Sequence, residues 1–286
     1  MNIRQALNNA IKILKNAKKE SPALDAGVIL CFLLGWEKEY LLTHYDYEIC
    51  DEKVQEYLNL VNLRAQGVPL QYITGNCEFM SLMFNVNPAV LIPRPETEIL
   101  VEAVLDYVNK QVIEYPRILD MGTGSGCIAV SLAYYIKNCF VTAVDISENA
   151  LEIAYSNALK NGVADKIDFI CSNLFEKLYD KPGTLSSLDI IVSNPPYISS
   201  SEIETLQTEV KDHEPIIALD GGKDGLYYYK KITEAAPAFL KKGGLLAFEV
   251  GYNQASAVRK IMEKHFEDIN IIKDLAGINR VVVGRK

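Results

Sequence analysis

The chain has 286 residues, a formal net charge of −8 at pH 7, and 49% hydrophobic and 23% charged residues. This composition is that of a soluble globular protein, and the length favours about two domains. The acidic balance argues against a protein held on nucleic acid by clustered Lys and Arg, and no apolar run approaches the about 18 residues of a membrane span. Since the N-terminus also lacks a signal-peptide pattern, we expect a cytoplasmic protein without direct contact to nucleic acid or membranes.

Residues 1–75 have helical patterns and form the first predicted domain. Apolar side chains recur at three- and four-residue spacing over 3–17, which is typical of an amphipathic helix. A Ser-Pro start and a Gly stop predict a second helix over 21–35, and a third covers 51–66. Residues 76–92 contain short apolar runs with Asn and Pro, which predict a β-hairpin or linker.

Residues 93–286 alternate between helical windows and short apolar strands. Such alternation predicts an α/β fold with a doubly wound, mostly parallel sheet of seven strands covered by helices on both faces. The last two strands are too close in sequence for a crossover, so they must pair antiparallel and close one sheet edge. The predicted strands are 117–120, 140–145, 167–171, 188–193, 245–250, 269–275 and 280–283, and the predicted helices are 96–109, 126–137, 147–161, 225–240 and 253–266.

A glycine-rich loop, Asp120-Met121-Gly122-Thr123-Gly124-Ser125-Gly126, joins the first strand of this sheet to a helix. Its glycines let the backbone turn tightly and approach a ligand at the carboxyl end of the strand, where doubly wound sheets bind ligands. Asp145, at the end of the next strand, can accept hydrogen bonds from both ribose hydroxyls of an adenosine. Together, the loop and the acid predict a nucleotide-type cofactor site.

The loop reads G-x-G-x-G, not the G-x-G-x-x-G of dinucleotide sites, and it begins with Asp120. An acid there repels a pyrophosphate but attracts the ammonium and sulfonium of S-adenosylmethionine. The pattern resembles motif I of the class I methyltransferases, and this resemblance implies that Asn173 can bond the adenine and Leu174 can cover its face. The predicted cofactor-binding residues are Asp120, Gly122, Thr123, Gly124, Ser125, Gly126, Asp145, Asn173, Leu174 and, from the motif described next, Asn194.

The fourth predicted strand leads into Asn194-Pro195-Pro196-Tyr197. The prolines stiffen the backbone and carry no N–H, so nearby carbonyls keep their place without competing donors. The Asn194 oxygen and a backbone carbonyl can accept both hydrogens of a planar NH₂ group, and Tyr197 offers an aromatic wall. Such a site orients an amide or amine nitrogen toward an electrophilic methyl group. The predicted catalytic residues are Asn194, Pro195 and Tyr197, and the predicted substrate-binding residues are Asn194, Pro195, Pro196 and Tyr197.

With these motifs, the chain resembles the peptide chain release factor glutamine methyltransferases, the PrmC/HemK family of Rossmann-like class I methyltransferases. The resemblance implies N5-methylation of the glutamine in the Gly-Gly-Gln motif of bacterial release factors 1 and 2, with S-adenosylhomocysteine as product. Because none of the six cysteines forms a C-x-x-C pair, we also expect no metal. It also implies that Asn194 and the Pro195 carbonyl bind the glutamine amide, and that the helical domain helps to hold the release factor. We further expect a monomer. The segments that carry the resemblance are 69–75, 92–98, 122–126, 194–197 and 219–226.

Three other interpretations are compatible with the sequence. A ribosomal protein glutamine methyltransferase shares the amide-binding motif, although residues 94–98 resemble the release factor branch better. An adenine-N6 DNA methyltransferase also uses an Asn-Pro-Pro-Tyr site, but usually needs a basic recognition region. A nucleotide-binding regulator without enzymatic activity would leave the amide-binding motif idle. Residues 94–98 also have the pattern of a capped helix start, and whether they face the cofactor pocket is open.

Overall fold

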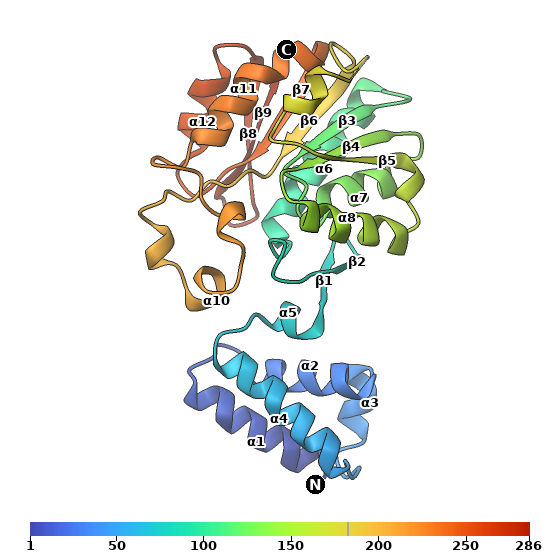
Figure 1. The fold of residues 1–286 in the computed structure, drawn as a ribbon, viewed down its shortest axis with the longest axis vertical. Coiled ribbons are helices and arrows are strands. Elements are labelled where there is room, and N and C mark those ends of the chain that lie inside the picture. The colour runs from blue at the N-terminus through green and yellow to red at the C-terminus, as the bar shows by residue number, and fades with distance from the viewer. Residues whose placement is uncertain (182) are drawn as a thin grey trace. The chain divides into compact units, whose positions relative to one another are not determined.

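The computed structural model describes residues 1–181 and 183–286. The described chain forms two compact units, one of Met1–Asn76 with Gln207–His213 and the other of Cys77–Leu206 with Glu214–Lys286. Figure 1 labels their elements along the chain. Within the described ranges, no helix has both the length and the apolar character needed to cross a bilayer.

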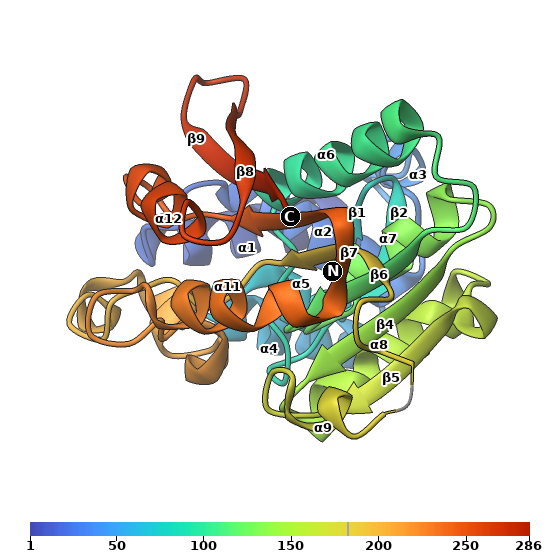
Figure 2. The same cartoon turned by 90° about the horizontal axis from the view of Figure 1, so that it is seen from above.

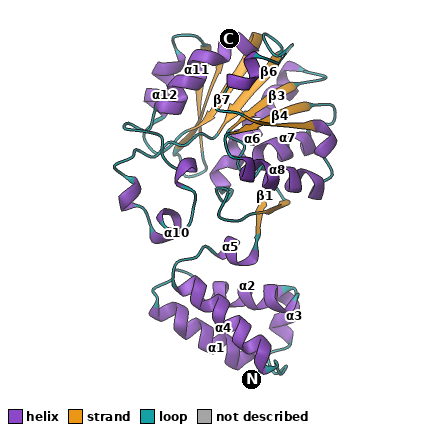
Figure 3. Ribbon diagram, viewed as in Figure 1, coloured by secondary structure: helices purple, strands orange, loops and turns teal. Residues whose placement is uncertain are grey.

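The smaller unit is helical, as predicted for the N-terminal domain (Figure 3). Its first helix begins with a capping box, in which the Asn2 and Gln5 side chains each accept the other residue's backbone N–H. Gly35 ends the second helix in the left-handed conformation, as the sequence predicted. The helices are α1 (Ile3–Asn16), α2 (Pro22–Leu34), α3 (Lys38–Thr43), α4 (Asp51–Ala65), α5 (Leu70–Thr74) and α10 (Thr208–Lys211).

A buried cation joins three segments of this helical unit. Arg64 on α4 is 8% exposed and bonds Asp25 on α2 at 2.7 Å. It also bonds Glu209 on α10 at 2.7 Å, and Lys19 reaches the same Glu209 oxygen at 3.0 Å. A buried charge is tolerated only when it is paired, so these bonds attach residues 207–213 to the helices. The sequence had placed these residues within the segment 93–286.

The larger unit contains a seven-stranded sheet with the order β5-β4-β3-β6-β7-β9-β8. The strands from β3 to β7 pair in parallel, and β9 is antiparallel to both β7 and β8. The predicted mostly parallel sheet with an antiparallel edge is confirmed. The strands are β3 (Arg117–Met121), β4 (Phe140–Asp145), β5 (Ile167–Cys171), β6 (Leu188–Ser193), β7 (Leu240–Glu249), β8 (Glu267–Lys273) and β9 (Asn279–Arg285).

Alternate residues of each strand enter two apolar cores, because successive side chains point to opposite faces of a sheet. Ile118 and Ile190 pack under α6, α7 and α8, whereas Leu119 and Ile191 pack under α9, α11 and α12. Figure 2 shows α6 and α11 on opposite sides of the sheet, so the sheet is doubly wound as predicted. The helices are α6 (Pro95–Gln111), α7 (Cys127–Tyr135), α8 (Glu148–Lys160), α9 (Glu176–Tyr179), α11 (Tyr227–Phe239) and α12 (Ala255–Met262).

The remaining elements are short. The predicted hairpin is present as a two-stranded sheet of β1 (Asn76–Phe79) and β2 (Leu82–Asn85). Single 3₁₀ turns cover Ala164–Lys166, Ile203–Thr205 and Ile216–Ala218. Helices α3, α5, α9 and α10 were not predicted, because four to six residues are too few to establish a helical period.

We expect Arg64→Met to lower the free energy of unfolding of the helical unit by about 3–5 kcal/mol, because it leaves Asp25 buried without its cation. The only Trp of the chain, Trp36, lies in this unit, so its fluorescence during urea denaturation reports the change. The control Arg4→Met removes an exposed pair with Asp46 and should cost less than about 1 kcal/mol. Equal urea midpoints for Arg64→Met and wild type would contradict the prediction.

Candidate active site

The glycine loop follows β3 and the Asn-Pro-Pro-Tyr motif follows β6, and the two motifs begin at the same height along the sheet. β3 and β6 are paired in parallel, with Asp120 opposite Val192. Gly122 and Asn194 each lie two residues further along, so the register brings them out side by side at the carboxyl ends of the strands. Ser193 fixes this arrangement by donating from its hydroxyl to the Met121 carbonyl at 2.6 Å. The crevice beyond the carboxyl ends is where doubly wound sheets bind ligands.

The glycine loop is shaped by its own sheet. The Val144 carbonyl on β4 accepts the backbone N–H groups of Gly122 at 2.8 Å and Thr123 at 2.9 Å. The N–H of Gly124 donates to the Asp145 carboxylate at 2.8 Å. These bonds tie the loop after β3 to the end of β4, which is the geometry expected from the sequence. Hydrogen bonds within the sheet therefore hold the loop in this shape.

Gly126 serves helix packing. It has a φ of 79°, and a Cβ added to it would lie 2.9 Å from the Cβ of Ala154 on α8. Only glycine combines this backbone conformation with so close an approach. Gly126 thus lets α7 begin directly against α8, and it does not line the cavity described below.

Two carboxylates lie at the loop in different surroundings. Asp120 is fully buried beneath it and accepts the Thr123 hydroxyl at 2.6 Å and the Ala129 N–H at 3.2 Å, all on one oxygen. The other oxygen has no hydrogen-bond partner among the described residues. Burial raises the pKa of Asp120 to about 7. Asp145 is half-buried, and burial raises its pKa against the opposing backbone hydrogen bonds.

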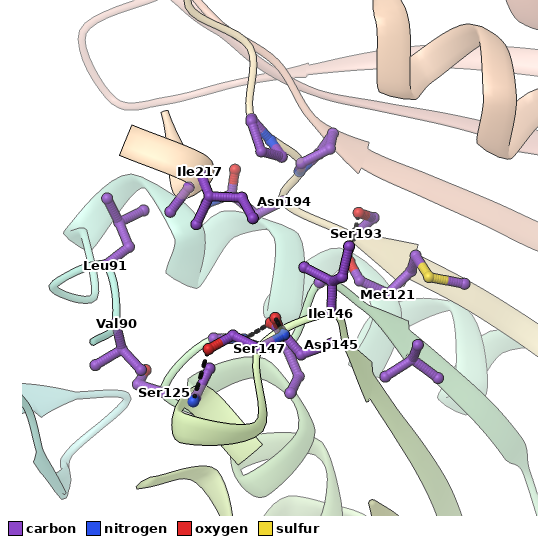
Figure 4. A pocket seen from close by; sticks show the side chains of 18 of the residues that line it. Val90, Leu91, Met121, Ser125, Asp145, Ile146, Ser147, Ser193, Asn194 and Ile217 are labelled. Carbon is purple, nitrogen blue, oxygen red and sulfur yellow. Dashed lines mark hydrogen bonds between the residues drawn. The ribbon is translucent and has the colours of Figure 1, made fainter. Parts of the chain in front are cut away.

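A cavity of about 1060 Å³, open to solvent, lies where the two motifs meet. Figure 4 shows Asp145 and Asn194 lining it from separate strands. Asp120, Gly126 and Tyr197 were predicted as site residues but do not line it. Within the described ranges, no group of three or more His, Cys, Asp or Glu side chains could hold a metal ion. The predicted site residues that line the cavity are Gly122, Thr123, Gly124, Ser125, Asp145, Asn173, Leu174, Asn194, Pro195 and Pro196.

Asn173 and Leu174 form one wall of the cavity. The Asn173 amide donates to Glu176 at 2.7 Å, while its side chain stays exposed. Leu174 has a φ of 49° and packs partly against the core of the second sheet face. Both residues are placed where a flat ring could lie against them, and their contact with adenine stays a prediction.

Packing from behind holds the Asn-Pro-Pro-Tyr motif in place. The Tyr197 carbonyl accepts the Gln254 amide at 2.8 Å. A Cβ on Gly221 would lie 2.8 Å from both the Pro196 carbonyl oxygen and the Tyr197 Cα, so the glycine segment 219–226 touches the motif's backbone. Burial raises the pKa of Tyr197 to about 12. Tyr197 therefore supports the motif from outside the cavity lining as a neutral side chain.

Several residues next to the Asn-Pro-Pro-Tyr motif were not predicted from the sequence. Thr97 lines the cavity and contacts Asn194, which answers the open question about segment 94–98. Glu249 lies behind Thr97, and its signal was a charge at the end of the apolar strand β7. Segments 89–93 and 215–218 also contribute lining residues. Residues 92–93 belong to the segment 92–98 that carries the family resemblance, and the others have no motif that could be recognised.

Comparisons with known proteins agree with this geometry. Residues 5–75 match the family model of the PrmC N-terminal domain, and residues 96–212 match that of the methyltransferase small domain. The release factor glutamine methyltransferase of Clostridium acetobutylicum is 41% identical over 284 residues, which cover 99% of this chain and 98% of the relative. The chain belongs to the release factor glutamine methyltransferase family. The predicted family is thereby confirmed, and the chain is a methyltransferase.

Other relatives agree with this membership. The release factor glutamine methyltransferase of Koribacter versatilis is 42% identical over 286 residues, covering 100% of this chain and 99% of the relative. The solved structure of a 16S rRNA methyltransferase from T. thermophilus, in complex with AdoMet and guanosine, has a TM-score of 0.53 at 18% identity. The match covers 74% of this chain and 49% of that one, and it shows a shared fold.

We expect Asp120→Asn to weaken the pH dependence of stability in this methyltransferase. The wild-type carboxyl has a folded pKa of about 7 against an ordinary value of 3.8, so the folded state binds the proton more tightly. The free energy of unfolding therefore falls as pH rises from about 4 to about 7. The variant lacks this ionisable group, so its stability relative to wild type should rise by about 3 kcal/mol between pH 5 and pH 8.

Urea denaturation at pH 5, 6, 7 and 8, followed by circular dichroism, measures this difference. The control Asp165→Asn changes an exposed carboxyl and should follow the wild-type curve. If Asp120→Asn instead ran parallel to wild type at all four pH values, burial would not be raising the pKa of this carboxyl.

Proposed function

We propose that this chain transfers the methyl group of S-adenosylmethionine to the side-chain amide nitrogen of the glutamine in the Gly-Gly-Gln motif of release factors 1 and 2. One observation carries the proposal: Asn194 and Pro195 line the same cavity as the glycine loop. Relatives about 40% identical over the whole chain are release factor glutamine methyltransferases, which supports the glutamine and the release factor as substrate. A ribosomal protein or DNA substrate has no comparable support.

The cavity residues fit S-adenosylmethionine. No atom lies within 4 Å of the place a Cβ would occupy on Gly122 or Gly124, so their backbone is open to a ligand. The Asp145 carboxylate has about four lone-pair sites and uses two on backbone N–H groups, which leaves acceptors for ribose hydroxyls. Asp120 and Asp145 together favour a cationic ligand. When bound, the cofactor supplies an electrophilic methyl group on its sulfonium.

The chain's own residues must compensate for a weak nucleophile. The lone pair of an amide nitrogen is delocalised into the carbonyl, as in a peptide bond. The Asn194 side-chain oxygen and the Pro195 carbonyl accept the two N–H groups of the glutamine amide and hold its nitrogen in line with the methyl group. These bonds also favour the positive charge that develops on the nitrogen, which afterwards loses a proton. Alignment of this kind can supply roughly 7–11 kcal/mol in favourable cases.

The two units would then have separate tasks. Residues 93–286 carry the cofactor and the transfer chemistry, residues 76–92 form the connecting hairpin, and the helical residues 1–75 help to hold the release factor. The match of residues 5–75 to the PrmC N-terminal domain supports this division. We also propose that the protein acts as a monomer, and a substrate from the translation machinery implies action in the cytoplasm.

Methyl transfer to three candidate substrates tests the proposal directly. Purified release factor, ribosomal protein and DNA are incubated side by side with the enzyme and methyl-labelled S-adenosylmethionine. We expect label only on the release factor, and none once the Gly-Gly-Gln glutamine is replaced by glutamate, which has no amide nitrogen. Label on DNA, or on a release factor without that glutamine, would overturn the substrate assignment.

We expect Asn194→Ala to reduce the rate of methyl transfer by roughly 100-fold or more, because the glutamine nitrogen loses one of its two acceptors. Binding of S-adenosylhomocysteine, measured by calorimetry, should persist because the glycine loop is untouched. Asn270→Ala on the exposed strand β8 is the matched control and should retain full activity. Full activity in Asn194→Ala would remove that side chain from the mechanism.

A further inference from the structure

A chain of two hydrogen bonds runs from the substrate side of the site into the core. The Asn194 side-chain NH₂, after β6, donates to the Thr97 hydroxyl on α6 at 3.2 Å. The Thr97 hydroxyl donates to the Glu249 carboxylate at the end of β7 at 2.6 Å. Thr97 is 2% exposed and Glu249 is 3% exposed, so water has little access to the bond between them. The cavity lining includes Asn194 and Thr97 but not Glu249.

The number of protons available fixes the direction of both bonds. An ionised carboxylate only accepts, so Thr97 must direct its single proton at Glu249. The lone pairs of the Thr97 oxygen are then left for Asn194, and only the NH₂ end of that amide can donate to them. The Asn194 oxygen therefore has to point the other way. Among the described residues, the Asn194 side chain makes its hydrogen bond through the NH₂ end, which leaves the oxygen available to a ligand.

We propose that Thr97 and Glu249 are positioning residues that lock the Asn194 amide with its oxygen toward the substrate nitrogen. This inference rests on the proposed function. It also identifies what the site selects: a group that donates two N–H bonds. A carboxylate in the same place would set lone pairs against the Asn194 oxygen, so the lock favours glutamine over glutamate. An amide free to rotate would discriminate less, because its NH₂ end could donate a hydrogen bond to a carboxylate.

The lock depends on the ionisation of Glu249. Burial raises the pKa of this carboxyl to about 7. Once protonated, it can donate to Thr97, which can then donate to the Asn194 oxygen and turn the amide around. Methyl transfer should therefore fall as pH drops through about 7. The titratable and charged groups that act on Glu249 from the surrounding elements are Arg94, Glu96, Cys127, Tyr197, Tyr229 and Arg280.

The first experiment compares variants of Thr97 in release factor methylation. Thr97→Val keeps the shape but lacks the hydroxyl, and should lower kcat roughly 10- to 100-fold because the amide is no longer oriented. The affinity for S-adenosylhomocysteine should stay within about twofold of wild type. Thr97→Ser restores the hydroxyl and should recover activity to within about threefold of wild type. Thr233→Val is the matched control, because Thr233 is equally buried and its hydroxyl has no partner among the described residues.

The second experiment gives a readout that a structural role would not change. Wild-type kcat should rise between pH 6 and pH 8 with a midpoint near the pKa of Glu249, about 7. Glu249→Gln cannot ionise and its amide can donate to Thr97, so kcat should be roughly tenfold lower at pH 8 and flat across this range.

The outcomes separate the two proposals. If wild type does not methylate the release factor, the proposed function fails. If wild type is active and Thr97→Val matches it, the positioning role is wrong. A loss shared equally by Thr97→Val and Thr97→Ser, or an unchanged pH profile in Glu249→Gln, also overturns the role. Should Thr97→Val fail to fold, the pH profile of Glu249→Gln alone decides.

Discussion

The parallel pairing of β3 with β6 is the constraint on which the site depends. These two central strands are buried on both faces, and their register sets Asp120 opposite Val192. A slip of one residue would turn every side chain to the other core and separate the glycine loop from Asn194. The burial of alternate apolar side chains under helices on both faces makes that slip costly. Packing of the sheet thus aligns the glycine loop with the Asn-Pro-Pro-Tyr motif, although they lie 72 residues apart. The hydrogen bond from Ser193 to Met121 joins the two strand ends directly.

Two buried acids, Asp120 and Glu249, lie at the carboxyl edge of this sheet. Asp120 and Glu249 are almost fully buried, and burial raises the pKa of each to about 7. Burying such groups costs stability unless their hydrogen bonds are complete, and one Asp120 oxygen has no partner among residues 1–181 and 183–286. Under the proposed function, Asp120 adds negative charge behind the cofactor loop and Glu249 orients Asn194, while the neighbouring apolar strands offset the cost of burying both acids.

Features set by residues close together in the sequence were predicted accurately, whereas contacts between residues far apart in the sequence were not. Strands 167–171 and 188–193 matched their predicted bounds because short apolar runs between turns are a local signal. β7 begins at Leu240, not at the predicted 245, because Lys241 and Lys242 interrupt its apolar pattern. The glycine loop and the Asn-Pro-Pro-Tyr motif are contiguous and could be recognised. The bond between Thr97 and Glu249 joins residues 152 positions apart, and no periodicity in a single sequence reports such a pair.

Residues 207–213 belong to the helical unit, so this unit cannot be separated from the rest of the protein by one cut in the chain. The chain enters the helical unit twice, once from the N-terminus and once through the excursion that carries Glu209. A fragment cut after residue 76 would lose the acid that Arg64 and Lys19 share, and the complementary fragment would expose an orphaned Glu209. The helical unit therefore cannot be exchanged whole by a single cut in the chain, because it consists of two separate segments. Replacing residues 1–76 alone would leave Glu209 without the Arg64 and Lys19 cations that it contacts.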